Sequence, residues 1–120
     1  MHIQFAELPV RDQARAKHFY VDNFGCAVAA DAPMGSDGWR WIELKFAGSE
    51  TRLHLVHARV GDASDGPVLV LVDDDVAVTI EGLRSRSVEI LTEPHSPAWQ
   101  PGRTVAEFRD SEGNRMVISD

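Results

Sequence analysis

The sequence predicts an α+β fold of two βαβββ modules, and two observations support this prediction. The first is a repeated pattern of an apolar strand ending in Val, an Asp placed to cap a helix, and a helix-forming run. Val10 and Asp12 carry it in the first half, and Val72 and Asp74 carry it after the same interval in the second half. The second observation is a terminal hairpin at residues 104–118, in which an alternating strand is followed by the loop Asp-Ser-Glu-Gly-Asn and a second, apolar strand. We therefore expect two helices on the outside of a curved mixed sheet around a cup.

The first module is expected to begin with a strand at residues 3–10, whose alternate side chains face opposite sides of the sheet. Asp12 should cap a helix that runs to about Phe24, and Gly25 should end it. The buried stripe of this helix is expected to contain Ala16, Phe19, Tyr20 and Phe24. The remaining elements are a strand at 26–31, a loop rich in Pro and Gly at 31–38, a strand at 39–46 and a return strand at 51–57.

A linker rich in Gly, Asp and Ser at residues 59–66 separates the modules. We expect residues 1–120 to be a single domain, made of module 1–58 and module 67–120. The elements expected in the second module are a strand at 68–72, a helix at 75–84, a strand at 88–92, a Pro-rich loop at 93–102 and the terminal hairpin.

The composition excludes several classes of protein. The formal net charge is -7 and no basic patch is visible, so a nucleic-acid partner is not expected. No apolar run approaches the length of a membrane span, and no signal peptide is visible, so a membrane partner is not expected. Cys26 is the one cysteine, which excludes an internal disulfide and fits a reducing, cytoplasmic location.

Alternation in the two central strands of the first module predicts one polar, aromatic face. Ile42 and its alternate neighbours should pack on the helix, which leaves Trp41 and Glu43 on the concave face. If the turn between the strands is symmetric, Glu43 lies directly opposite His54, within reach of a hydrogen bond.

The chain resembles the vicinal oxygen chelate superfamily, which contains glyoxalase I, bleomycin-resistance proteins and extradiol dioxygenases. The matching segments are LPVRD and HFYVDNFG in the first half, VLVDD in the second half, and PAWQPGRTVAEFRDSEGN near the end. The resemblance implies two modules that share one core, a small organic ligand and a homodimer, and it leaves open whether the cup closes within one chain or across the dimer. It predicts the fold better than the activity, because this fold carries many chemistries.

The resemblance also implies where a metal would bind. The metal-dependent members use four ligands, and the corresponding positions here are Phe5, His54, Pro67 and Val117. Of these residues His54 alone can bind a metal, whereas a divalent ion needs three or more protein ligands. We therefore expect no metal and no cofactor.

Carboxylates and indoles could instead bind a small molecule, including a cationic one, on the concave face. The expected ligand-binding residues are Glu7, Trp39, Trp41, Arg52, His54, Trp99 and Glu107. The alternative for each of these residues is a solvated strand position, a core edge or a subunit interface.

Two classes of function remain open. A metal-free binding protein of the bleomycin-resistance kind is favoured by the missing ligand set. In an enzyme, His54 would act as the catalytic acid or base with Glu43 orienting it. A glyoxalase-like lyase or a dioxygenase would need an unusual metal site built from His54, Glu43, Glu7 and Glu107.

Overall fold

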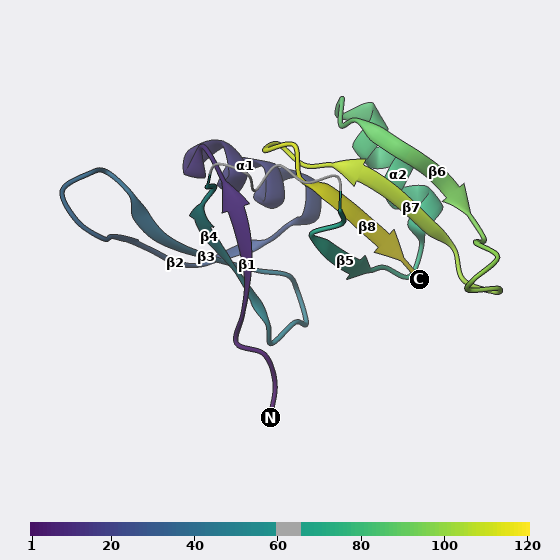
Figure 1. The fold of residues 1–120 in the computed structure, drawn as a ribbon, viewed down its shortest axis with the longest axis horizontal. Coiled ribbons are helices and arrows are strands. Elements are labelled where there is room, and N and C mark those ends of the chain that lie inside the picture. The colour runs from purple at the N-terminus through teal and green to yellow at the C-terminus, as the bar shows by residue number, and fades with distance from the viewer. Residues whose placement is uncertain (60–65) are drawn as a thin grey trace. The chain divides into compact units, whose positions relative to one another are not determined.

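The computed structural model describes residues 1–59 and 66–120. The chain divides into two compact units, Met1–Asp62 and Ala63–Asp120, and each unit has the element order βαβββ (Figure 1). The predicted α+β class and the two modules are therefore confirmed. Most of the predicted linker, residues 60–65, lies outside the described residues.

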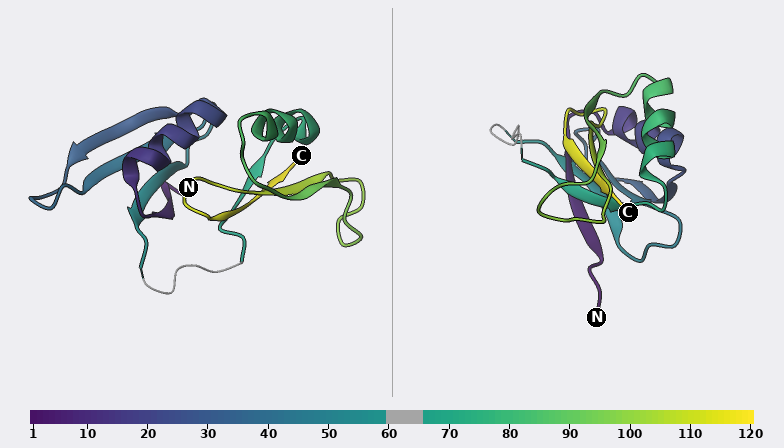
Figure 2. Two further views of the ribbon diagram at one scale, coloured as in Figure 1. Left: turned by 90° about the horizontal axis from the view of Figure 1, so that it is seen from above. Right: turned by 90° about the vertical axis from the view of Figure 1, so that its right-hand side faces the viewer.

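The first unit is a four-stranded mixed sheet with one helix on one of its faces. Its sheet has the order β1-β4-β3-β2, in which β1 and β4 are parallel and the other neighbours are antiparallel. Figure 2 shows the helix alongside this sheet. The elements are β1 (Phe5–Val10), α1 (Gln13–Phe24), β2 (Ala27–Pro33), β3 (Arg40–Lys45) and β4 (Arg52–His57).

Helix α1 begins and ends as the sequence predicts. The side chain of Asp12 accepts a hydrogen bond from the backbone N–H of Arg15, and this bond satisfies a donor that the first turn leaves free. Gly25 adopts a left-handed conformation with φ of 65°, which a side chain would disfavour. Ala16 and Tyr20 are fully buried, as predicted, whereas Phe19 and Phe24 are half-buried beside them.

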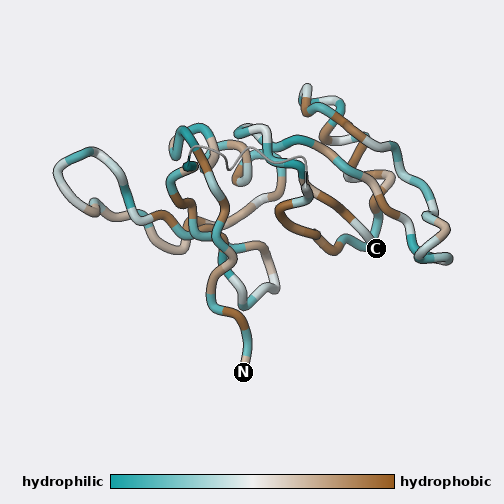
Figure 3. The backbone as a smooth tube through the Cα atoms, in the orientation of Figure 1, coloured by the Kyte–Doolittle hydropathy of each residue, from teal (hydrophilic) through white to brown (hydrophobic). Residues whose placement is uncertain are grey.

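The second unit repeats this topology with the sheet order β5-β8-β7-β6, in which β5 and β8 are parallel. Strand β5 is apolar along its length (Figure 3), although Val70 and Val72 are exposed. The elements of this unit are β5 (Leu69–Val72), α2 (Val76–Ser85), β6 (Ile90–His95), β7 (Val105–Arg109) and β8 (Arg115–Ser119).

The cap of α2 differs from the prediction by one residue. The repeat predicts Asp74 as the cap, but Asp75 caps the helix by accepting from the N–H of Val78. Asp73 binds the N–H of Asp75 and the hydroxyl of Thr79, which adds one residue to the turn before the helix. The interval between the modules is therefore not constant through this turn.

Two strands extend into segments that the sequence predicts as loops. Strand β6 runs to His95, whereas residues 93–102 are predicted to be loop, and β2 runs to Pro33 rather than residue 31. Both strands lie at the edge of their sheets, where a proline breaks no ladder hydrogen bond on the solvent side. The shift in register between Thr92 and His95 accommodates Pro94. Pro33 and Pro94 therefore lie in edge strands and not in loops.

The helix side of each sheet forms its core. In the first unit the buried apolar side chains include Leu8, Val10, Ile42, Leu44, Leu53 and Leu55, and in the second they include Ile80, Leu83, Ala106, Phe108, Met116 and Ile118. Neither helix is long and apolar enough to cross a membrane, within the part of the chain that the structure describes.

Candidate ligand-binding surface

The side of the first sheet that faces away from α1 carries most of the predicted site residues. Because side chains alternate along a strand, the burial of Leu53 and Leu55 against the helix places Arg52 and His54 on the opposite face. We call this surface, formed by Phe5, Glu7, Trp41, Glu43, Arg52 and His54, the far face. Alternation in the sequence also places Glu7, Trp41, Glu43, Arg52 and His54 on one face, and their role in ligand binding stays a prediction.

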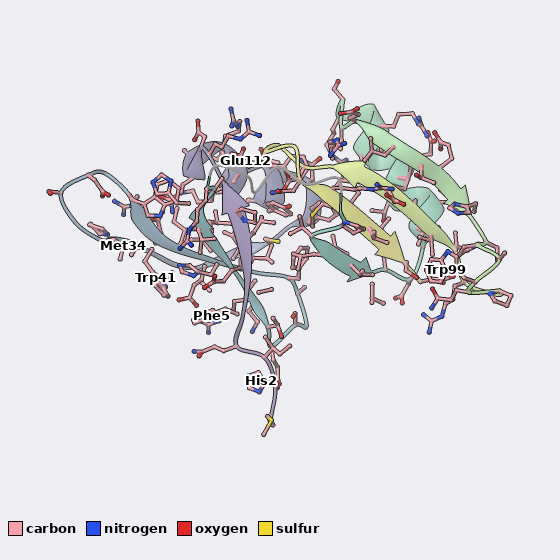
Figure 4. All side chains as sticks on the ribbon, viewed as in Figure 1. His2, Phe5, Met34, Trp41, Trp99 and Glu112 are labelled. Atoms are coloured by element: carbon pink, nitrogen blue, oxygen red, sulfur yellow. The ribbon has the colours of Figure 1, made fainter. Side chains whose placement is uncertain are left out.

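Three rings form the centre of the far face. Trp41 and His54 lie with ring centroids 3.9 Å apart at an angle of 32°, and Phe5 contacts Trp41 edge-on at 5.9 Å (Figure 4). The Phe5 and His54 centroids are 5.7 Å apart. His54 is buried, with 7% of its surface exposed, whereas Phe5 and Trp41 are half-buried. Half-buried rings leave aromatic surface accessible to a ligand.

Glu43 holds the indole of Trp41 and the guanidinium of Arg52 through two charge-assisted hydrogen bonds. One carboxylate oxygen accepts from the indole Nε1–H of Trp41 at 2.6 Å, and the other accepts from Nη1–H of Arg52 at 2.9 Å. These two bonds, the one from Trp41 foremost, hold the pKa of Glu43 below its ordinary value although burial opposes them. Glu43 is therefore an ionised structural group, and the Trp41 ring offers its π surface with its N–H already bonded.

The predicted register of Glu43 and His54 is confirmed, but the predicted hydrogen bond between them is absent. The two residues are Cα partners across β3 and β4. Both oxygens of Glu43 bind other groups, and among the described residues the carboxylate near His54 is that of Glu7, 3.9 Å from Nδ1. The Glu7 side chain is 68% exposed. His54 therefore packs on the rings of Phe5 and Trp41 without a hydrogen bond from Glu43.

Trp39 is predicted to lie on the concave face, but it is not part of the far face. It precedes β3 and its ring stacks on His57, with centroids 3.6 Å apart and an angle of 16°. His57 lies three residues after His54 on the same strand and so faces the other side. Trp39 also lines a recess of about 460 Å³ with Arg11, Gln13 and Lys17 at the start of α1. The alternation assumed in the sequence fails because β3 begins only at Arg40.

The second unit holds the other two predicted ligand residues. The carboxylate of Glu107 accepts a hydrogen bond from Arg115, and Trp99 is 76% exposed after β6. The Glu107–Arg115 pair repeats the Glu43–Arg52 pair, because each joins the third strand of a module to its fourth. These pairs neutralise two of the three carboxylates on which the prediction of a cationic ligand depends.

A recess adjoins the far face at the end of β1 and β4. It has a volume of about 570 Å³ and is lined by Glu7, Pro9, Val56, His57 and Arg59. Volumes of several hundred Å³ are typical of small-molecule sites. The recess shares these two strands with the aromatic centre but lies at the end opposite to Phe5 and Arg52.

The residues at the metal positions do not fit a metal. Phe5 and Val117 have no donor atom, Pro67 offers no side-chain ligand, and His54 packs against the ring of Phe5. Residues 1–59 and 66–120 also contain no group of three or more His, Cys, Asp or Glu that could hold an ion. The unusual metal site considered from the sequence thus has no support in these contacts.

Comparisons with known proteins agree with the topology. A family model described as the Glyoxalase/Bleomycin resistance protein/Dioxygenase superfamily matches residues 2–118. The protein YetH of Bacillus subtilis is 32% identical over 113 residues, which are 92% of this chain and 91% of YetH. The crystal structure of UcmS2 has a TM-score of 0.84 at 26% identity and covers 100% of this chain and 98% of its own. That of TnmS3, an antibiotic binding protein from Streptomyces sp. CB03234, has a TM-score of 0.81 at 31% identity and covers 98% and 93%.

Proposed function

The chain belongs to the glyoxalase/bleomycin resistance protein/dioxygenase superfamily, and from this premise we propose that it is a metal-free small-molecule binding protein. Its ligand lies on the far face of the first sheet. The observation that carries the proposal is the cluster of Phe5, Trp41 and His54, in which Glu43 holds the indole of Trp41 in place. A rigid, half-buried indole with its N–H satisfied is suited to stack on an apolar or aromatic ligand.

Similarity to TnmS3 supports binding, because that protein is described as an antibiotic binding protein and is 31% identical over nearly the whole chain. The contacts of His54 favour binding over proton transfer. A general base needs an open path to the proton that it removes, whereas His54 is 7% exposed and packed between two rings. Glu43, its proposed partner in an enzyme, is occupied by Trp41 and Arg52.

The test of this proposal is a fluorescence titration with N-phenyl-1-naphthylamine, a neutral aromatic dye that becomes bright in apolar surroundings. We expect saturable binding to the wild-type protein and a loss of about tenfold or more in affinity for Trp41→Ala, since a stacked aromatic pair contributes about 1 kcal/mol beyond its buried area. Trp39→Ala is the matched control, because Trp39 stacks on His57 on the other side of β4. Equal affinities of wild type and Trp41→Ala would overturn the proposal.

The metal-free part of the proposal has its own measurement. Elemental analysis of the purified protein is expected to find less than stoichiometric transition metal, because His54 is the one donor among the four family positions. One equivalent of a metal that is lost in His54→Ala would contradict it.

A further inference from the structure

The far face has two ends that differ in charge. Phe5 is the Cα partner of Arg52, and Glu7 is the Cα partner of His54, two residues further along β1 and β4. Counting outward from the paired Leu44 and Leu53 brings Lys45 beside Arg52 on the next strand. Lys45 and Arg52 therefore lie together where β3 ends and β4 begins, next to the ring of Phe5.

Arg52 and Lys45 both have N–H donors that could bind an anion. Arg52 gives one N–H of Nη1 to Glu43, and its side chain is 41% exposed. A guanidinium carries five N–H donors, so most of them face no acceptor among the described residues. Lys45 is exposed and makes no ion pair within the described part of the chain. Because Glu43 balances one positive charge, Lys45, Arg52 and Glu43 together keep a net charge of about +1. Glu50, in the turn between β3 and β4, is 77% exposed and lies 3.4 Å from Nδ1 of His2.

The negative charge of Glu7 does not cancel the positive charge of Arg52 and Lys45. Glu7 lies two residues beyond Phe5 along β1, about 7 Å away at the usual rise of a strand. Its side chain is 68% exposed, so water and salt screen its effect on Arg52. The aromatic surface between them, formed by Phe5 and His54, thus has a basic end and an acidic end.

We propose that the ligand of this surface is an aromatic anion, whose rings cover Phe5 and Trp41 and whose acidic group binds Arg52 and Lys45. The inference rests on the proposed function and specifies its ligand class. Glu43 contributes by fixing the guanidinium of Arg52 with a hydrogen bond of 2.9 Å, so that less side-chain freedom is lost when the anion binds. The structure thereby favours an anionic ligand over the cationic one that the count of carboxylates indicates.

Two dyes with the same rings separate charge from stacking. The first is 8-anilinonaphthalene-1-sulfonate, and the second is N-phenyl-1-naphthylamine, which lacks the sulfonate. For Arg52→Gln we expect a loss of about five- to tenfold in affinity for the sulfonate dye, in keeping with a partly exposed charged hydrogen bond, and less than about twofold for the neutral dye. The loss should shrink as salt is added.

Two further variants keep the test decisive. Lys45→Gln leaves the Arg52–Glu43 pair in place and should also weaken the sulfonate dye selectively, so the result does not depend on an intact fold of Arg52→Gln. Arg84→Gln is the matched control, because Arg84 is 43% exposed and ion-paired with Glu81 and Glu93 in the second unit. It should leave both dyes unaffected.

The outcomes distinguish the two proposals. If Trp41→Ala weakens the binding of both dyes, but Arg52→Gln and Lys45→Gln change the two affinities equally or not at all, the proposed class of ligand is wrong and the proposed binding surface is supported. If Trp41→Ala changes neither dye, the binding surface itself is wrong. Selective loss of the sulfonate dye in both charge variants, with no change in Arg84→Gln, supports the inference.

Discussion

Replacing Glu43 should destabilise the first unit, because it removes hydrogen bonds that Glu43 accepts on the far face. Glu43→Gln removes the charge but keeps one amide oxygen, which can still accept from Trp41 or from Arg52. A hydrogen bond to a charged group contributes about 1.5–3 kcal/mol, and the bond to the half-exposed Arg52 contributes less, about 0.5–1 kcal/mol. We therefore expect Glu43→Gln to lower the free energy of unfolding by about 1–2 kcal/mol, and Glu43→Ala by about 2–4 kcal/mol.

The loss should depend on pH in one direction. The pKa of Glu43 is lower in the folded protein than its ordinary value of 4.5, so the folded state binds the proton less tightly than the unfolded state. The stabilisation by Glu43 is therefore complete above that value and disappears as the pH falls through the lowered pKa. Wild type and Glu43→Gln should differ most at neutral pH and converge in acid.

Urea unfolding at several pH values measures this difference. Glu50→Gln is the control, because the Glu50 side chain is 77% exposed and should change stability by less than about 0.5 kcal/mol. Trp41→Phe removes the same indole N–H, so the double variant with Glu43→Gln should lose less than the sum of the two single losses. Additive losses, or a difference that grows in acid, would refute the reasoning.

Three further predictions concern the first unit. Asp12→Ala removes the cap of α1 and should lower the free energy of unfolding in urea by about 1 kcal/mol. Asp12→Asn keeps an acceptor oxygen and should stay close to wild type, and an equal loss in both variants would contradict the cap. Gly25→Ala puts a side chain at φ of 65° and should cost about 1–2 kcal/mol, and an unchanged midpoint would contradict the left-handed cap. Burial raises the pKa of the Cys26 thiol to about 11, so a disulfide reagent at pH 8 should label it only after unfolding, and rapid labelling of the native protein would disprove its burial.

The fold was largely readable from the sequence because local signals agree with one another. The Asp12 cap, the Gly25 stop and the alternation around Glu43 each specify one element, and the repeat supports them all. The sequence mispredicts the fold at turns and at strand ends, where a difference of one or two residues moves the boundary of an element. The turn before α2 contains an extra Asp. Edge strands tolerate prolines, whereas a proline in the sequence suggests a loop.

The site was predicted in part. Alternation placed Trp41, Glu43 and His54 on one face, because a period of two follows directly from strand geometry. It could not predict the partner of Glu43, since the choice between Trp41, Arg52 and His54 depends on side-chain conformers. Alternation predicts the wrong face for Trp39 because this residue precedes the start of β3 at Arg40. The roles of the site residues and the homodimer implied by the resemblance stay predictions.

The most direct test of the binding surface is an NMR titration that follows the indole N–H signals of the three tryptophans. Trp41→Phe and Trp39→Phe identify two of these signals by their disappearance. On addition of 8-anilinonaphthalene-1-sulfonate, the signal of Trp41 should shift progressively and saturate, because its ring lies in the proposed site and its N–H reports the bond to Glu43. The signal of Trp39, which stacks on His57, should stay in place. A shift of Trp39 with no change at Trp41 would contradict the account.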